Sequence, residues 1–100
     1  MNPARGEAAI TVGGAVLTLR PSFTALVAAE QELGSLFALV ERTAEGRITL
    51  QEMVALFWHC LVQPEGGVSR ERLGEAVAEI GLVNATPVLK ALIAQILKGR

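Results

Sequence analysis

His59 and Cys60 are the residues whose types could support nucleophilic catalysis, and each is the only one of its kind in the chain. A Cys–His pair requires two side chains that face each other and a third group that orients the base. Both residues fall inside a predicted helix, where neighbouring side chains point about 100° apart. We therefore expect His59 at a helix surface or boundary and Cys60 as a small buried apolar residue. No catalytic residue follows, and the chain is not expected to be an enzyme.

Residues 41–52 have the spacing of a calcium-binding loop. The residues in the order of an EF-hand loop are Glu41, Thr43, Glu45, Gly46, Ile48 and Glu52. Such loops favour the short ligands Asp and Asn in their first half, and the chain contains no Asp. A capping box formed by Thr49 and Glu52 explains the same positions. A degenerate, EF-hand-like calcium site is therefore an alternative, and neither a metal nor a cofactor is expected.

Gly13 and Gly14 separate two short apolar runs, 7–12 and 15–20. Glycine adopts positive φ without strain, and the tight primed turns of β-hairpins require positive φ. The pair lacks the G-x-x-x-x-G-K pattern of a phosphate-binding loop and is followed by a strand. The sequence therefore predicts a β-hairpin over residues 7–20. A lone hairpin is only marginally stable, so this one must pack against the rest of the chain.

Start and stop signals divide residues 22–98 into four to five short helices. The predicted N-caps are Ser22, Ser35, Thr49, Ser69 and Thr86, the last followed by Pro87 at the first helical position. The predicted stops are Gly34, Gly46, Pro64 with Gly66-Gly67, and Gly81. We expect an α+β fold in a single domain over residues 1–100, with the hairpin at 7–20 and a compact helical part at 22–98.

Apolar stripes at helical spacing predict the buried faces of these helices. They comprise Phe23, Leu26, Val27 and Leu33; Leu36, Phe37, Leu39 and Val40; Leu50, Met53, Val54, Phe57 and Leu61; Leu73, Val77 and Ile80; and Val88, Leu89, Leu92, Ile93, Ile96 and Leu97. Some apolar residues lie outside these stripes, including Leu56 in the third helix and much of the last helix, and we expect most of them to belong to the core. We expect Trp58, Val62, Ile93 and Leu97 to contact a protein partner.

The composition argues against several classes of function. The formal net charge is -1 and 51% of residues are hydrophobic. Nucleic-acid binding is not expected, because it requires clustered Lys and Arg. The single cysteine rules out an internal disulfide and fits a reducing, cytoplasmic location, and no signal peptide is expected. The longest nearly apolar run, 82–97, is too short and too polar to span a bilayer, so no membrane partner is expected.

Several short motifs follow one another along the chain. After Arg5-Gly6-Glu7 come LTLRPSF at 17–23, EQELG at 30–34, AEGRIT at 44–49, GVS at 67–69 and AEIGL at 78–82. In this order they resemble the small tail protein encoded by the gene transfer agents of α-proteobacteria and by related tailed phages. That family is described both as a tail assembly chaperone and as a tail tube protein.

The resemblance implies a non-enzymatic role with no catalytic residues to transfer. A tail assembly chaperone covers the long helical tape-measure protein while the tube polymerises, so the implied partner is a tape-measure or other tail protein. Weak homo-oligomerisation is also implied. The alternatives are a structural tube subunit and a generic protein-interaction domain. Tube subunits are usually rich in β-structure, so a chain with one hairpin and mostly helix favours the chaperone.

Overall fold

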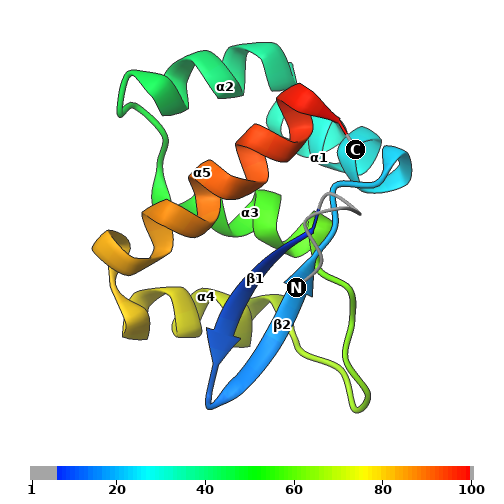
Figure 1. Ribbon diagram of the computed structural model, residues 1–100, viewed down its shortest axis with the longest axis vertical. Helices are drawn as coiled ribbons and strands as arrows, with labels where there is room; N and C mark the ends of the chain where they lie inside the picture. The colour runs from blue at the N-terminus through cyan, green and yellow to red at the C-terminus, as the bar shows by residue number, and fades with distance from the viewer. Residues whose placement is uncertain (1–6, 100) are drawn as a thin grey trace.

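The fold places a β-hairpin before five helices in the described part of the chain, residues 7–99 of a computed structural model (Figure 1). The elements are β1 (Ala8–Val12), β2 (Ala15–Leu19), α1 (Phe23–Leu33), α2 (Leu36–Ala44), α3 (Leu50–Cys60), α4 (Arg70–Ile80) and α5 (Leu82–Lys98). The Cα radius of gyration is 12.4 Å, close to the ~13 Å of a compact chain of this length. The predicted α+β fold is confirmed.

The hairpin is antiparallel and turns at two glycines. Ala8 lies opposite Leu19, and Val12 lies opposite Ala15. Gly13 and Gly14 have φ of 55° and 82°, as a primed two-residue turn requires. Because side chains alternate along a strand, one face carries the apolar residues. The buried residues of that face are Ala8, Ile10, Val12, Leu17 and Leu19.

The end of α3 attaches to the outer edge of β2. The Arg20 amide donates to the Cys60 carbonyl at 2.7 Å, and the Val62 amide donates to the Thr18 carbonyl at 2.9 Å. The Arg20 guanidinium also pairs with the buried carboxylate of Glu7. These bonds make the segment after α3 a short third strand in effect, and they fix the hairpin against the helices.

Four of the predicted N-caps are confirmed by side-chain hydrogen bonds. The hydroxyls of Ser22, Ser35 and Ser69 each accept the amide three residues on, at 3.0 to 3.2 Å. Thr49 forms a full capping box: its hydroxyl accepts the Glu52 amide at 3.1 Å, and Glu52 accepts the Thr49 amide at 2.9 Å. Local sequence alone determines these helix starts.

The predicted start of the last helix is wrong. The helix α5 begins at Leu82, so Thr86 and Pro87 lie inside it, and Gly81 is the N-cap. Gly81 also ends α4 with φ 85°, and its carbonyl accepts the amide of Ala85 at 3.0 Å. Ala85 is fully buried. The helix extends upstream of the proline because this first turn packs into the core.

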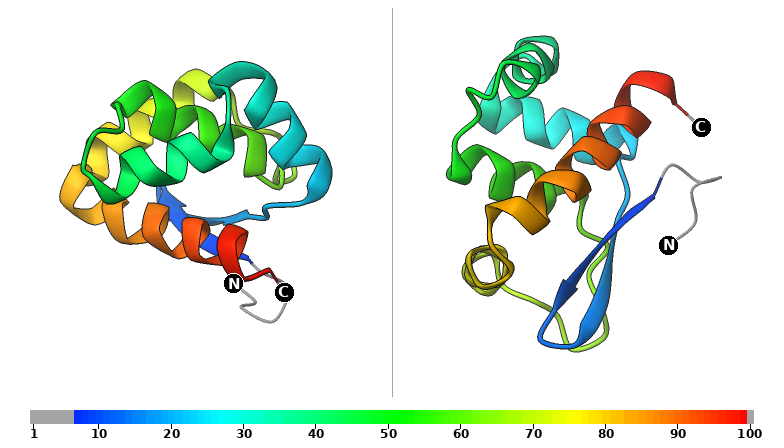
Figure 2. Two further views of the ribbon diagram at one scale, coloured as in Figure 1. Left: turned by 90° about the horizontal axis from the view of Figure 1, so that it is seen from above. Right: turned by 60° about the vertical axis from the view of Figure 1, so that its left-hand side comes forward.

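The helices pack around α3, which lies between α1 and α4, while α5 packs against α4 and β1 (Figure 2). Phe57 and Leu56 of α3 are fully buried. Leu56 lies outside the predicted stripe of α3 but belongs to the core, because α3 has neighbours on more than one side. Leu61 lies beyond α3 and pairs with Leu19 of β2.

The buried face of α1 matches the prediction only in part: Leu26 and Leu33 pack against the core as predicted, whereas Phe23 and Val27 do not. Ala25 and Ala29 are buried, whereas Phe23 is 83% exposed and Val27 38% exposed. The small alanines allow the backbone of α1 to approach α3 closely, and the larger residues are displaced toward solvent. In α2 only Leu39 is fully buried, and Phe37 remains 81% exposed. The first two helices therefore leave large apolar side chains on the surface.

Candidate interaction surface

A hollow between α2 and α5 gathers much of this exposed apolar surface. Two adjoining depressions of about 290 and 600 Å³ share Val40 and Leu97. We call the surface they form the α2–α5 groove. Its α2 wall consists of Leu36, Phe37, Val40, Thr43 and Ala44. Its α5 wall consists of Thr86, Lys90, Ile93, Ala94, Ile96 and Leu97, and Glu30 of α1 and Gly46 also line the groove. Each wall follows the spacing of one helix face.

The groove is open enough to accept another chain. Phe37 is 81% exposed and Leu97 is 63% exposed, while Ile93 forms part of the buried floor at 9%. Ser35 caps α2 and Gly46 ends the segment that follows it, so the direction of α2 is set by local signals. An apolar groove between two neighbouring helices is the kind of surface that binds an amphipathic helix.

The structure separates the four predicted partner contacts into two places. Ile93 and Leu97 line the α2–α5 groove. Trp58 is half-buried against the core, and Val62 is 38% exposed on the segment bonded to β2. Neither is among the residues that line the groove. Their role in partner binding stays a prediction.

Sequence reasoning missed the α2 wall, above all Phe37 and Val40. These residues were assigned to the buried face of their helix because of their apolar spacing. A signal was present: α2 has four large apolar residues within its first five positions, and a short helix packed on one neighbour cannot bury them all. The juxtaposition with α5 is tertiary and has no local signature.

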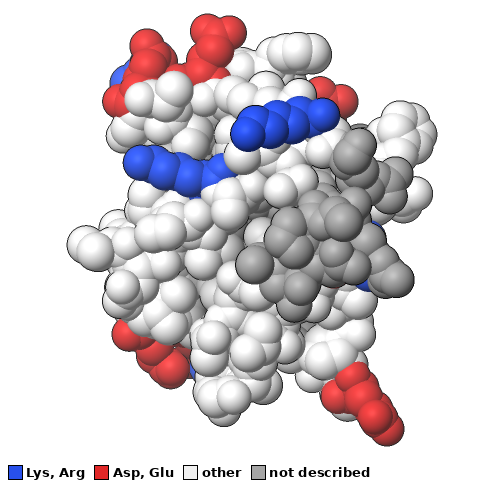
Figure 3. All heavy atoms as spheres, viewed as in Figure 1, with Lys and Arg blue, Asp and Glu red and all other residues white. Residues whose placement is uncertain are grey.

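The charges beside the groove are unevenly distributed. Figure 3 shows basic side chains lying over α5 and acidic ones over α2. The described arginines all form ion pairs with glutamates: Arg20, Arg42, Arg47, Arg70 and Arg72. Lys90 and Lys98 form no ion pair within residues 7–99. Both lysines belong to α5 and are exposed.

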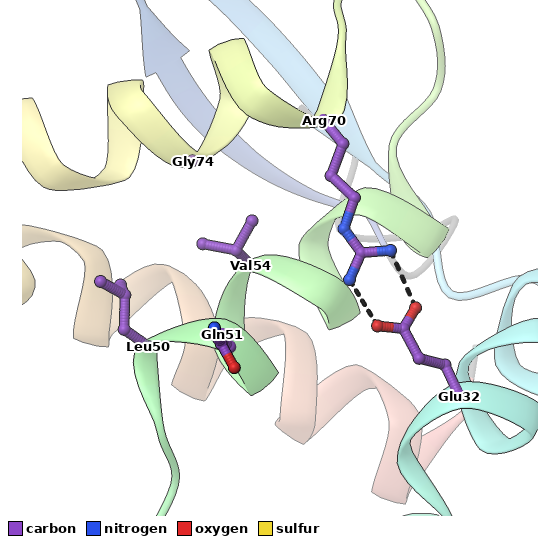
Figure 4. A pocket seen from close by; sticks show the side chains of 6 residues that line it. All are labelled: Glu32, Leu50, Gln51, Val54, Arg70 and Gly74. Atoms are coloured by element: carbon purple, nitrogen blue, oxygen red, sulfur yellow. Dashed lines mark hydrogen bonds and ion pairs between the residues drawn. The ribbon is translucent and has the colours of Figure 1, made fainter.

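A second hollow, of about 410 Å³, lies beside an ion cluster that joins three helices, and Figure 4 shows the pair of Glu32 and Arg70 at its side. Glu32 of α1 accepts two hydrogen bonds from the Arg70 guanidinium of α4, one of them at 2.9 Å. His59 of α3 lies 2.8 Å from the same carboxylate. Hydrogen bonds from Arg70 and then from His59 lower the pKa of Glu32 to about 2. The carboxylate is held as an anion between two hydrogen-bond partners. Its role is therefore to link the three helices.

His59 belongs to this ion cluster, whereas Cys60 is buried in the core. The His59 imidazole bonds to Glu32 and not to Cys60. Cys60 is 2% exposed, and burial raises its pKa to about 12. A thiol in that state is a poor nucleophile. The pair therefore has neither the geometry nor the ionisation of a Cys–His catalytic site.

Two of the three carboxylates in the loop of residues 41–52, those of Glu45 and Glu52, form ion pairs within the fold. Glu52 accepts a hydrogen bond from the Thr49 amide and a second from Arg42 at 2.5 Å, and these bonds lower its pKa. Glu45 pairs with Arg47. The Thr43 hydroxyl donates to the Leu39 carbonyl. Among residues 7–99 no group of three or more His, Cys, Asp or Glu side chains is placed to hold a metal.

Within residues 7–99 the β1 edge opposite β2 forms no backbone hydrogen bond to another element. Ala9 and Thr11 lie opposite Thr18 and Val16, and Thr18 directs its carbonyl away from β1. By the alternation of an antiparallel pair, Ala9 and Thr11 also direct their amides and carbonyls outward. No bond to these groups joins β1 to another element within residues 7–99. A hollow of about 450 Å³ lies along this edge, beside the corner between α4 and α5.

In residues 7–99 no single helix combines the length and apolarity needed to cross a bilayer. Two helix pairs reach that length and composition only across sharp bends, α1 with α2 at 77° and α4 with α5 at 118°.

The comparison with protein families gives one match that covers nearly the whole chain. Residues 5–99 match the model of the family described as "Phage tail tube protein, GTA-gp10". No curated protein and no solved structure matches the chain. The family match extends from before β1 to the end of α5 and so includes both walls of the groove.

Proposed function

The chain belongs to the phage tail protein family described as "Phage tail tube protein, GTA-gp10", and on that premise we propose that it is a non-enzymatic tail assembly chaperone. In this proposal it acts in the cytoplasm during tail assembly. It binds helical segments of the tape-measure protein and leaves before the particle is complete. The family membership supports a role in the tails of phages or gene transfer agents and protein–protein contacts with other tail components.

The observation that carries the proposal is the α2–α5 groove. Its walls present Phe37, Val40 and Leu97 around a floor that includes Ile93. An amphipathic helix buries its apolar face in such a groove through residues at positions i, i+3, i+4 and i+7. A long helical protein offers many such segments, and later displacement requires that the groove bind each of them with modest affinity.

The test is capture of a tape-measure protein, which is sought among the products of the genes next to the one that encodes this chain. Co-expression and pull-down should recover it with the wild-type protein, and Phe37→Glu should abolish recovery by placing a charge in the groove. Phe23→Glu is the matched control, because Phe23 is also a highly exposed phenylalanine, at 83%, but does not line the groove. Equal recovery with Phe37→Glu and wild type would contradict the proposal, provided that both variants retain the wild-type circular dichroism spectrum.

A structural tube subunit is the second candidate function. The family description favours it, and so does the edge of β1 opposite β2, since a strand edge can bond to a neighbouring chain. Mass spectrometry of purified particles separates the two candidates. The chaperone is expected to be absent from finished particles, whereas a tube subunit is present in stoichiometric amounts. A Thr11→Pro variant, which removes one outward amide of β1, should block assembly only if the edge pairs in the tube.

A further inference from the structure

We propose that the α2–α5 groove selects its partner by charge: it accepts an amphipathic helix whose flank facing α5 carries acidic residues. This inference rests on the proposed function and adds the chemistry of the partner helix. It is an inference about the two lysines of α5, and it makes the groove more than a general apolar surface.

The first support is that the charges left unpaired are grouped. Every described arginine is neutralised by a glutamate of the same chain, at N–O distances up to 3.6 Å. Within residues 7–99, Lys90 and Lys98 form no ion pair, and both belong to α5, which forms one wall of the groove. Lys90 itself lines the groove, next to Ile93 and Leu97. Two free cations beside an apolar channel form the charged rim of a binding site.

The second support is their spacing. Lys90 and Lys98 are separated by eight residues of continuous helix, which is about 12 Å along the axis. Two acidic residues seven positions apart on a docked helix lie about 10.5 Å apart on one face. Along the helix axis the lysines therefore match a pair of acids spaced by two turns, although Lys98 lies about 80° around α5 from Lys90 and beyond the residues that line the groove.

The opposite wall determines which flank carries the acids. Glu41 of α2 is exposed and forms no ion pair within residues 7–99, and Glu30 lines the groove with its carboxylate on the Leu36 amide at 3.1 Å. An acidic flank is repelled from this wall and attracted to α5. The groove thus distinguishes the two edges of a bound helix, and this fixes the direction in which the helix lies.

The test uses two synthetic helical peptides with the same apolar stripe. The acidic peptide has glutamates seven positions apart on one flank, and the neutral peptide has glutamines at those positions. Fluorescence anisotropy at low salt should show the acidic peptide binding roughly two- to thirtyfold more tightly, as expected for two solvent-exposed ion pairs. Raising the salt to about 0.5 M should reduce this preference, because exposed pairs are screened.

Variants of the protein separate charge recognition from overall charge. Lys90→Gln with Lys98→Gln should remove the preference for the acidic peptide. Thr24→Glu with Gln51→Glu lowers the net charge equally at exposed positions that do not line the groove, and should leave the preference intact. Lys90→Glu with Lys98→Glu should instead favour a third peptide that has lysines on the flank.

Each outcome decides between the two proposals. Equal binding of the acidic and neutral peptides, or no binding of either, overturns the charge inference. If the tape-measure protein is still captured and Phe37→Glu abolishes that capture, the proposed function stands without it. If Phe37→Glu leaves capture unchanged, the proposed function fails whatever the peptides do.

Discussion

Replacing Pro87 with alanine should stabilise this protein, because the proline lies inside α5 and not at its start. Pro87 is the sixth residue of the helix Leu82–Lys98. It has no amide hydrogen, so the carbonyl of Val83, four residues earlier, lacks its helical partner, and the proline ring crowds that carbonyl. An alanine restores the bond and removes the crowding.

The size of the effect follows from the surroundings of the proline. Proline is about 3 kcal/mol less favourable than alanine inside a helix. Proline also restricts the unfolded chain, so replacing it with alanine gives up about 0.4–1 kcal/mol of stability. This loss offsets part of the gain. Val83 is 85% exposed, so water can reach the turn that contains the unpaired carbonyl, which reduces the penalty further. We expect Pro87→Ala to raise the free energy of unfolding by about 1–2 kcal/mol.

The assay is urea denaturation followed by the fluorescence of Trp58, the only tryptophan. A small domain loses roughly 1 kcal/mol per molar urea or somewhat more, so the midpoint should rise by about 1 M. Thr86→Ala is the companion variant. The Thr86 hydroxyl donates to the Leu82 carbonyl at 2.6 Å inside the helix, so its loss should change stability by less than about 0.5 kcal/mol.

The opposite result would refute the position of the helix start. If α5 began at Thr86, the threonine would be an N-cap and its loss would cost about 1 kcal/mol. Pro87 would then occupy the first helical position, and alanine there would be neutral or destabilising. Destabilisation by both variants would therefore restore the start that the sequence alone suggests.

Three further predictions concern other elements. Thr49→Ala should lower the free energy of unfolding by about 1 kcal/mol in thermal or urea denaturation, because it removes the capping box of α3; an unchanged midpoint would show that Glu52 alone caps the helix. The depressed pKa of Glu32, about 2 against 4.5, contributes stability that is fully present above about pH 4.5 and is lost as the pH falls toward 2. Glu32→Gln should therefore flatten the decline of Tm between pH 5 and 2, whereas Glu75→Gln should leave the decline as in wild type. Burial raises the pKa of Cys60 to about 12, so a thiol reagent at pH 8 should label the folded protein only at the rate of opening and the urea-unfolded protein at once; rapid labelling without urea would contradict this burial.

Local signals in the sequence predicted the element boundaries well. Ser22, Ser35, Thr49 and Ser69 cap helices as expected, because a cap depends on residues within one turn. Gly13 and Gly14 likewise determine the hairpin turn. The exception is instructive: Thr86-Pro87 has the form of a helix start, but the burial of Ala85 extends the helix upstream and overrides it.

The buried face of each helix was predicted less well, because it depends on which neighbouring element the helix packs against. The predicted stripe of α1 included Phe23 and Val27, yet the helix packs through Ala25 and Ala29 together with Leu26 and Leu33. Close approach of two helices gains more contact from small residues than a bulky stripe can provide at that distance. Sequence spacing identifies apolar faces and does not identify the partner that covers them.

The same limit explains the candidate site. Ile93 and Leu97 were selected from the sequence because α5 is apolar over most of its circumference, and both line the groove. Phe37 and Val40 were not selected, because the groove exists only where α2 lies beside α5. No local pattern distinguishes an apolar residue that a neighbour covers from one that the neighbour leaves open.

The helix α2 connects stability to binding in this fold. Of its large apolar residues only Leu39 is fully buried, and the glycines on either side, Gly34 and Gly46, have φ of 81° and 72°. The helix thus contributes little to the core and most of one groove wall. A bound helix adds burial where the free protein has least, so binding must raise the stability of the native state by mass action. The apolar residues that the isolated chain leaves exposed, Phe37 above all, are the ones through which a partner would complete the packing.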